Sequence, residues 1–189
     1  MFDISRAAKL DIPGRITELK PAKLLKEIAH IKKGMICVDL ACGTGTLAIP
    51  MAELTGIKGK VYAVDRSPEM LEHLRHKNPP ENIVTVQSDV ANTGLGNEIA
   101  DFCLMAFILH EVEKPESIIK EAGRLLKPGG RIMVIEWRED RDSPGPSPQV
   151  RVKRPLVKRL FEENGFSDGE FVNWSENYYT ALAGKQTLV

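Results

Sequence analysis

Short apolar segments alternate with amphipathic segments along the middle of the chain. The apolar segments predict strands at residues 35–40, 60–64, 82–86, 100–109 and 131–135. Helical spacing of apolar residues predicts helices at 19–31, 46–54, 68–77 and 115–126. Strands that alternate with helices are typical of a parallel sheet built from right-handed crossovers. The pattern therefore predicts a doubly wound α/β fold.

The pattern changes after Trp137. A charged stretch and the Pro- and Gly-rich residues 143–148 predict a loop. A helix at 154–164 and two strands at 170–174 and 178–183 follow, and the polar turn between these strands predicts an antiparallel pair. We expect residues 1–189 to form a single domain, divided into an N-terminal lid and helix (1–33), a core (34–137) and a loop, helix and strand pair (138–189).

The composition limits the class of function. The 189 residues are 42% hydrophobic and 28% charged, which is typical of a globular protein. The formal net charge is zero, so no overall field favours nucleic acid or an anionic membrane. Cys37, Cys42 and Cys103 have the spacing of neither a disulfide framework nor a zinc site, and no metal is expected. Because residues 102–109 are too few to cross a bilayer and residues 1–6 are unlike a secretory signal, we expect a cytoplasmic protein.

A glycine-rich turn after the first predicted strand indicates a ligand site. Gly43 and Gly45 let the backbone turn tightly and let a ligand approach closely. The N–H groups at the start of the next helix face such a ligand. Asp65 follows Gly45 by twenty residues, at the end of the second strand, where a carboxylate binds two ribose hydroxyls. These features fit a nicotinamide dinucleotide and S-adenosylmethionine equally well.

Asp39 distinguishes between the two cofactors. A carboxylate beside the glycine loop repels a pyrophosphate and attracts a cationic ammonium or sulfonium group. Asp89, after the third strand, can accept a hydrogen bond from the exocyclic amine of adenine. The alternative interpretation is that Asp39 and Asp89 only cap turns.

Residues 34–137 resemble the class I S-adenosylmethionine-dependent methyltransferases, and among them the group that includes the ubiquinone/menaquinone C-methyltransferases. The matching segments, in the expected order and spacing, are 38–45, 64–70, 88–90, 101–112 and 126–131. The resemblance implies a Rossmann-like, three-layer α/β/α arrangement with a seven-stranded sheet of order 3-2-1-4-5-7-6, in which strand 7 is antiparallel. The chain departs from the family at Ala41, where glycine is frequent.

The resemblance also implies that S-adenosyl-L-methionine is the cofactor and S-adenosyl-L-homocysteine the product. Asp39 and the loop would hold the methionine moiety, Asp65 the ribose hydroxyls, and residues 88–90 the adenine. Arg66 would pack beside the adenine, and the carbonyl of Ala106 would face the ammonium group. The implied cofactor-binding residues are Asp39, Ala41, Cys42, Gly43, Gly45, Asp65, Arg66, Ser88, Asp89, Val90 and Ala106.

Methyl transfer depends mainly on aligning the acceptor and excluding water, and a base is needed only where the acceptor loses a proton. His110, after the fourth strand, is the candidate base, because an unperturbed imidazole has a pKa of about 6.5. The alternative is that His110 only lines the pocket or caps the next segment. We expect Glu111 to be a solvated loop residue and consider Glu136, at the end of the fifth strand, for a substrate contact.

The walls of the substrate site are expected to come from outside the core. Residues 1–33 would form a lid, with Arg6, Asp11, Pro13 and Arg15 ahead of an amphipathic helix, and residues 142–149 a second flap. Trp174, Tyr178 and Tyr179 could add aromatic surface, although such strand residues are more often core. A cationic cluster could bind an anionic substrate or RNA, or form a solvated helix face; it comprises Arg151, Lys153, Arg154, Lys158 and Arg159.

The leading hypothesis is a methyltransferase that acts on a small molecule, because the neutral chain carries no RNA-binding module. RNA or protein remains the alternative substrate on the same fold. An NAD(P)-binding oxidoreductase is a second class, disfavoured by Asp39 and Asp89. A nucleotide-binding protein without turnover is the third.

Overall fold

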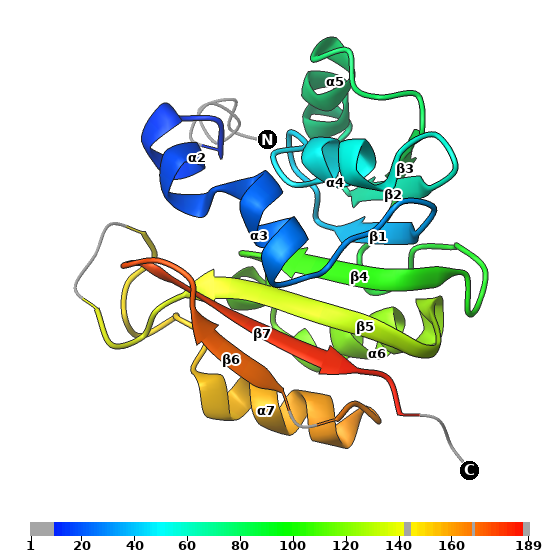
Figure 1. Ribbon diagram of the computed structural model, residues 1–189. Helices are drawn as coiled ribbons and strands as arrows, with labels where there is room; N and C mark the ends of the chain where they lie inside the picture. Colours follow the sequence, from blue (N-terminus) through cyan, green and yellow to red (C-terminus); the bar gives the residue numbers. More distant parts are fainter. Residues whose placement is uncertain (1–9, 142–144, 168, 187–189) are drawn as a thin grey trace. The chain divides into compact units, whose positions relative to one another are not determined.

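The computed structural model describes residues 10–141, 145–167 and 169–186. The chain divides into two compact units, Met1–Gly94 and Leu95–Val189. The sheet has the order β3-β2-β1-β4-β5-β7-β6, with β7 antiparallel to β5 and β6 (Figure 1). The predicted α/β class, the strand order and the antiparallel strand are therefore confirmed.

The first unit contains three parallel strands, β1 (Ile36–Leu40), β2 (Lys60–Asp65) and β3 (Ile83–Gln87). The buried side chains of these strands are mainly apolar. In β1, Cys37, Val38 and Leu40 have no solvent exposure. Helix α4 (Ala48–Thr55) packs against all three strands, and α5 (Pro68–His76) packs against β2 and β3. The parallel register brings the carboxyl ends of β1 and β2 to one edge of the sheet.

Two short helices stand in the region where the sequence predicts a single helix at 19–31: one ends at residue 19 and was not predicted, and the other lies within the predicted range. They are α2 (Pro13–Leu19) and α3 (Pro21–Glu27), and α3 packs against α4. Lys20 separates them in a left-handed conformation, with φ of 47°. The prediction was wrong here because proline disfavours a helical conformation in the residue before it, while it begins a new helix readily.

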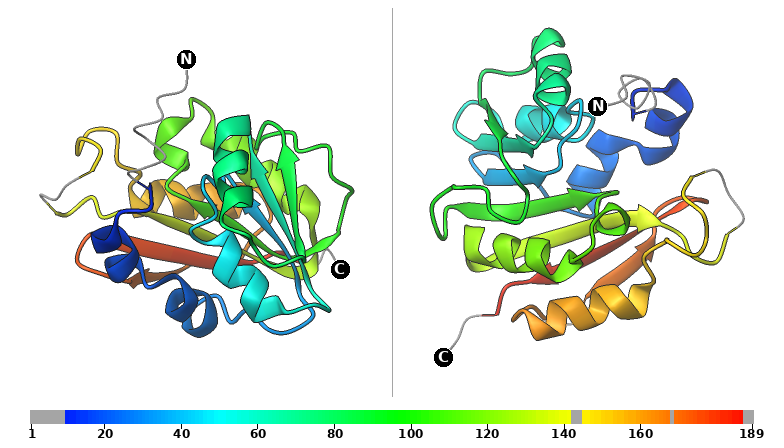
Figure 2. Two further views of the ribbon diagram at one scale, coloured as in Figure 1. Left: turned by 90° about the horizontal axis from the view of Figure 1, so that it is seen from above. Right: turned by 180° about the vertical axis from the view of Figure 1, so that it is seen from behind.

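The second unit contains β4 (Ala100–Ala106) and β5 (Leu126–Trp137) in parallel, followed by β7 (Tyr178–Gly184) and β6 (Glu170–Asn173). Helices α6 (Pro115–Leu125) and α7 (Arg154–Glu163) pack against each other and cover the strands in the view from behind (Figure 2). Cys37, Cys42 and Cys103 are all buried. No helix within the described ranges is long and apolar enough to cross a membrane.

Two boundaries in the second unit differ from the prediction. β4 ends at Ala106 rather than at residue 109, because Phe107 has a φ of 58° and a short 3-10 helix, η1 (Leu109–Glu111), follows. β5 begins at Leu126, so it includes residues 127–130, which the sequence predicted as a turn. Its pairing with β4 shifts register between Ala100 and Phe102, which accommodates those residues as an irregularity within the strand.

Candidate functional site

The glycine loop in the first unit is anchored to the end of β2. The N–H groups of Ala41 and Cys42 both donate to the carbonyl of Val64 at 2.9 Å. The N–H of Gly43 donates to the Asp65 carboxylate at 2.9 Å. Gly45 has a φ of 84°, and a Cβ atom there would lie 2.8 Å from Leu74 in α5. Glycine is therefore required at position 45 by both backbone conformation and packing.

Ala41 occupies a position that suits glycine. Its φ of 70° lies in the left-handed region, which costs a residue with a Cβ atom about 1–2 kcal/mol. The loop thus keeps the backbone path expected for a glycine although the chain carries alanine. The departure from the family pattern changes the strain in the loop and leaves its course intact.

Asp39 carries a buried carboxylate that has no hydrogen-bond partner among the residues the structure describes. Its side chain is 1% exposed, and neither carboxylate oxygen has a hydrogen-bond partner among the described residues. Burial first, and then the nearby charge of Asp65, raise its pKa to about 7. Because buried polar atoms are normally hydrogen-bonded, this carboxylate is suited to an added cation or donor. The alternative that Asp39 caps a turn is wrong, since its side chain accepts no hydrogen bond from any residue that the structure describes.

Asp65 holds the glycine loop with one oxygen and the start of α5 with the other. Besides Gly43, it accepts a hydrogen bond from the N–H of Ser67 at 2.9 Å. The Ser67 hydroxyl in turn accepts from the N–H of Met70 at 3.2 Å, which makes Ser67 the N-cap of α5. A carboxylate has about four lone-pair sites, so two backbone donors leave capacity for two hydroxyl groups. Ribose binding by Asp65 stays a prediction.

The residues predicted to meet the adenine lie in a turn after β3. Asp89 is exposed and accepts a hydrogen bond from the N–H of Ala91 at 2.8 Å, so it does cap a turn. The Ser88 hydroxyl donates to the carbonyl of Asn92 at 2.9 Å. Val90 is half-buried and Arg66 is exposed. The contacts of these residues with adenine stay predictions.

A network that the sequence did not reveal joins Asp11 to the glycine loop. Asp11 accepts hydrogen bonds from the hydroxyls of Thr44 at 2.9 Å and Thr46 at 3.1 Å, and pairs with Lys77 at 2.7 Å. Lys77 also donates to the carbonyl of Thr44 at 2.9 Å. Leu10 lies beside Gly43, because a Cβ atom there would meet it at 2.8 Å. The start of the predicted lid therefore contacts the loop, while Arg6 lies outside the described residues.

His110 in the second unit pairs with Glu136 from β5. The His110 Nδ1 atom lies 2.8 Å from Glu136 Oε2, and the Glu136 side chain is fully buried. Glu136 Oε1 accepts from the N–H of Leu109 at 3.0 Å. Glu111 is exposed, as predicted, with a carboxylate oxygen 4.0 Å from His110 Nε2. The sequence suggests a substrate contact as one role for Glu136. In the structure Glu136 lies next to the candidate base His110.

Three aromatic rings cluster at the ends of β4, β5 and β7. The ring of Tyr178 lies 5.0 Å from that of Phe107 and 4.9 Å from that of Trp137, between centroids. Tyr178 and Tyr179 are both buried, so their core location is confirmed and they add little aromatic surface. Trp174 is half-buried. The Ala106 carbonyl, at the end of β4, stays a predicted ammonium contact.

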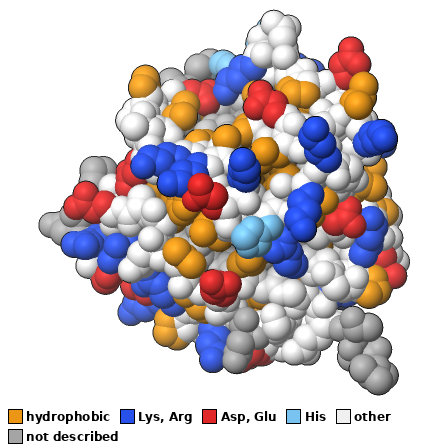
Figure 3. All heavy atoms as spheres, viewed as in Figure 1, with side chains coloured by type: hydrophobic (Ala, Val, Ile, Leu, Met, Phe, Trp, Pro, Cys, Tyr) orange, Lys and Arg blue, Asp and Glu red, His pale blue; other side chains and the backbone are white. Residues whose placement is uncertain are grey.

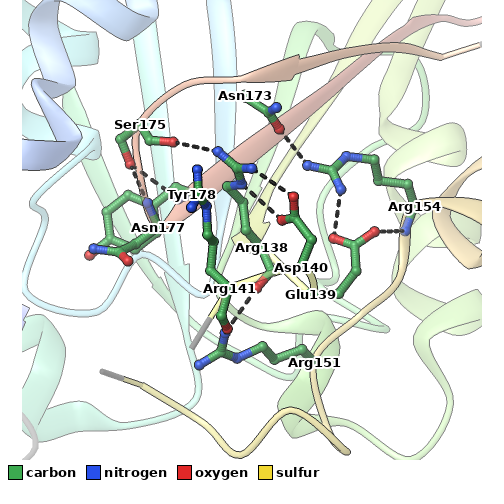
Figure 4. A network of polar contacts seen from close by, with 10 residues as sticks. All are labelled: Arg138, Glu139, Asp140, Arg141, Arg151, Arg154, Asn173, Ser175, Asn177 and Tyr178. Carbon is green, nitrogen blue, oxygen red and sulfur yellow. Dashed lines mark hydrogen bonds and ion pairs between the residues drawn. The ribbon is translucent and has the colours of Figure 1, made fainter. Parts of the chain in front are cut away.

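Arg151 and Arg138 are buried in the loop that follows β5 (Figure 4). The Arg151 guanidinium donates to the carbonyls of Arg138 at 2.9 Å, Arg141 at 2.6 Å and Pro146 at 3.0 Å. Arg138 pairs with Asp140 at 2.7 Å and holds the pKa of that carboxyl down to about 2. The contact with Pro146 ties the described part of the predicted flap, residues 145–149, to Arg151. Residues 142–144 of this flap lie outside the described residues.

Acidic neighbours neutralise much of the predicted cationic cluster. Arg154 pairs with Glu139 at 2.7 Å and lies over the ring of Tyr179. Two further pairs follow α7 at helical spacing, Lys158 with Glu162 and Arg159 with Glu163. On the face seen in Figure 3, basic side chains are interspersed with acidic and apolar ones. The solvated helix face is therefore the better interpretation of Lys158 and Arg159, and the binding of RNA or an anionic substrate loses support.

Comparison with known proteins decides the family. A family profile described as a methyltransferase domain matches residues 38–134. A solved S-adenosylmethionine-dependent methyltransferase from Aquifex aeolicus is 30% identical, with 98% of this chain and 100% of that chain covered and a TM-score of 0.89. This chain belongs to the S-adenosylmethionine-dependent methyltransferases. The resemblance seen in the sequence, its class I fold and its cofactor class are confirmed, and the oxidoreductase alternative is set aside.

Curated relatives match part of this methyltransferase. The demethylmenaquinone methyltransferase of Staphylococcus epidermidis is 35% identical over 108 residues, which cover 57% of this chain and 45% of that protein. The ubiquinone/menaquinone biosynthesis C-methyltransferase of Shewanella sediminis is 33% identical over 141 residues, covering 70% and 56%. The chain spans about half the length of these curated relatives.

The donor set of the first unit fits the methyltransferase cofactor. S-adenosylmethionine carries an ammonium and a sulfonium cation, and the buried carboxylate of Asp39 has no hydrogen-bond partner in the described part of the chain. A ribose presents hydroxyl donors, and Asp65 keeps acceptor capacity after its two backbone contacts. A pyrophosphate would instead bring negative charge to both carboxylates. The residues present therefore suit a cationic cofactor.

Proposed function

We propose that this chain transfers a methyl group from S-adenosylmethionine to a small-molecule acceptor. The observation that carries the proposal is Asp39, a fully buried carboxylate without a hydrogen-bond partner among the described residues. A carboxylate in that state is stabilised by a cation, and the cofactor supplies one through its ammonium group. Family membership supports the same reaction class.

In this proposal each cofactor contact has a separate physical basis. The Asp39 carboxylate binds the ammonium group, and the backbone of the glycine loop surrounds the methionine moiety. Asp65 accepts hydrogen bonds from the ribose hydroxyls. The turn at residues 88–90 binds the adenine. The exposed position of Asp89 and its one occupied oxygen are compatible with a further donor.

The proposed acceptor is an aromatic hydroxyl compound of the hydroquinone class. The names of the curated relatives refer to demethylmenaquinone and to ubiquinone and menaquinone biosynthesis, and the chain shares about half of their length. In the sequence, the aromatic residue Phe107 directly follows Ala106, and Trp137 directly follows Glu136. Trp137 is half-buried. Aromatic side chains favour planar aromatic ligands by stacking.

The proposed role of His110 is to accept the proton that such an acceptor loses. Loss of a hydroxyl proton makes a ring carbon of the hydroquinone nucleophilic, and as this carbon bonds to the methyl carbon, the bond between the methyl carbon and sulfur breaks. The hydrogen on the ring carbon then moves to the deprotonated oxygen, which restores the aromatic ring. The cofactor supplies the methyl group on a positively charged sulfur that leaves as a neutral thioether. General base catalysis of this kind contributes about 10²–10⁴-fold to a rate. The proposal includes a cytoplasmic location, which is the location predicted from the sequence.

The cofactor is tested by calorimetric titration of the purified protein with S-adenosylmethionine, S-adenosylhomocysteine and NADH. Micromolar binding of the first two and none of NADH is the expected result. Binding of NADH alone would overturn the proposed function.

The acceptor is tested by transfer of tritiated methyl groups from S-adenosylmethionine. Reduced 1,4-naphthoquinone is compared with an amine, an RNA oligonucleotide and a protein mixture. Label in the naphthalenediol, strongly reduced in His110→Ala and retained in Glu111→Gln, supports the proposal. Label in RNA or protein alone contradicts the small-molecule acceptor, and cofactor binding without labelling of any acceptor favours a protein without turnover.

A further inference from the structure

Glu136 lies at the end of β5 and is surrounded by nitrogen donors. Its side chain has no solvent exposure. Its two oxygens accept from the backbone N–H groups of Leu109 at 3.0 Å, His110 at 3.4 Å and Trp137 at 3.3 Å, in addition to facing His110 Nδ1 at 2.8 Å. Three backbone N–H groups that donate to one carboxyl group favour its ionised form. The site is therefore built around a buried negative charge.

The charge of Glu136 determines which nitrogen of His110 carries the proton. An ionised carboxylate can only accept, so at 2.8 Å it requires a proton on Nδ1. A neutral imidazole has one protonated and one unprotonated nitrogen, so Nε2 then carries the lone pair. The ring orientation is fixed as well, because the backbone N–H groups of the same turn hold Glu136 in place.

We propose that Glu136 is a positioning residue that keeps the His110 proton on Nδ1 and so makes Nε2 the proton acceptor during methyl transfer. This inference rests on the proposed function. As the new bond to the methyl carbon forms and its bond to sulfur breaks, the proton lost by the acceptor moves to Nε2. The resulting imidazolium keeps its Nδ1 contact with Glu136, and Nε2 later releases the proton to water.

A merely structural role for Glu136 makes a different prediction. In that case Glu136 serves only to accept the backbone N–H groups at η1, and the tautomer of His110 does not matter. Glu136→Gln separates the two roles, because the amide oxygen still accepts from Leu109 while the amide nitrogen is a donor. A donor that faces Nδ1 shifts the imidazole proton to Nε2 and removes the proton acceptor.

The tautomer is measured by nitrogen-15 NMR of histidine-labelled protein, with the His110 signals assigned by their loss in His110→Gln. Above the pKa of His110, the wild-type protein should show a protonated Nδ1 and an unprotonated Nε2. Glu136→Gln should invert this pattern and lower the pKa of His110 by about 1 unit, because an adjacent negative charge is removed. Glu111→Gln, which removes the more distant and exposed carboxylate on the Nε2 side, is the control and should keep the tautomer. A protonated Nε2 in the neutral wild-type ring overturns the inference even if Glu136→Gln fails to fold.

Turnover provides the second readout. With reduced 1,4-naphthoquinone as the probe, Glu136→Gln should lower kcat about 100-fold while calorimetry gives an unchanged Kd for S-adenosylmethionine. Glu136→Asp should recover part of the activity. An inverted tautomer with unchanged turnover refutes the positioning role and leaves the proposed function intact. Absence of methyl transfer to any acceptor in the wild-type protein refutes the proposed function, while NMR still decides the tautomer.

Discussion

Two buried carboxylates at the ends of strands differ sharply in their surroundings. Asp39 in β1 is 1% exposed and has no hydrogen-bond partner among the described residues. Glu136 in β5 is 0% exposed, faces His110 Nδ1 at 2.8 Å and accepts from backbone N–H groups. Glu136 is satisfied by the protein itself, whereas the surroundings of Asp39 leave its charge uncompensated. The surroundings of Glu136 suit a group that orients a neighbour, and those of Asp39 suit a group that binds a ligand.

The largest expected effect is an opposite response of the two carboxylates to neutralisation. The pKa of Asp39 is raised to about 7, above its ordinary value of 3.8, so the folded state favours the protonated form and loses stability as the pH rises from about 4 to 7. Asp39→Asn should therefore increase the free energy of unfolding at pH 8 by about 2–4 kcal/mol. Glu136→Gln should decrease it by about 1–3 kcal/mol, because charge-assisted hydrogen bonds are lost.

Urea unfolding of the ligand-free protein at pH 8 measures both changes. Glu53→Gln, which neutralises an exposed carboxylate on α4, is the control and should change stability by less than about 0.5 kcal/mol. Destabilisation by Asp39→Asn would show that the carboxylate has a partner within the folded protein.

Asp65 should contribute most of the ribose affinity. Asp65→Ala removes two charge-assisted acceptors and should weaken S-adenosylmethionine binding by about 2–4 kcal/mol in calorimetry. It also releases the Gly43 and Ser67 N–H groups, so the melting temperature should fall as well. Unchanged affinity would mean that Asp65 only anchors the loop.

The affinity for S-adenosylmethionine should depend on pH through Asp39. In the ligand-free protein its pKa is about 7, and a bound cation lowers it, so binding releases a proton below pH 7. The association constant should rise nearly tenfold per pH unit between about pH 5.5 and 6.5 and level off above pH 7. Calorimetry across this range measures the slope, and Asp39→Asn should abolish it. The same slope in the variant would assign the titration to another group.

The smallest effect is expected at Ala41. Glycine adopts its φ of 70° without the cost of a Cβ atom, while it makes the unfolded chain more flexible. Ala41→Gly should therefore stabilise the protein by about 0.5–1 kcal/mol in urea unfolding, with little change in cofactor affinity. A loss of stability would show that the Ala41 methyl group contributes packing that outweighs the backbone strain.

The order of the elements and the glycine loop could be predicted from the amino-acid sequence alone. Hydrophobic periodicity is local, and the steric needs of a tight turn are visible as Gly43 and Gly45, so both could be predicted. The carboxylates Asp39 and Asp65 were also predictable, because each lies at a strand end that the periodicity locates. Pro21 marks the start of α3, because proline begins a helix readily and disfavours a helical conformation in the residue before it.

The contacts between polar side chains could not be predicted in this way, because they join residues far apart in the sequence. His110 and Glu136 are 26 positions apart, and Asp11 and Lys77 are 66 apart. The sequence pattern likewise does not show that Asp39 is buried without a hydrogen-bond partner among the described residues. Nor does it show that Arg154 pairs with Glu139. Such contacts depend on strand register, loop course and side-chain direction. A local sequence pattern contains none of these, because they arise when distant segments pack together.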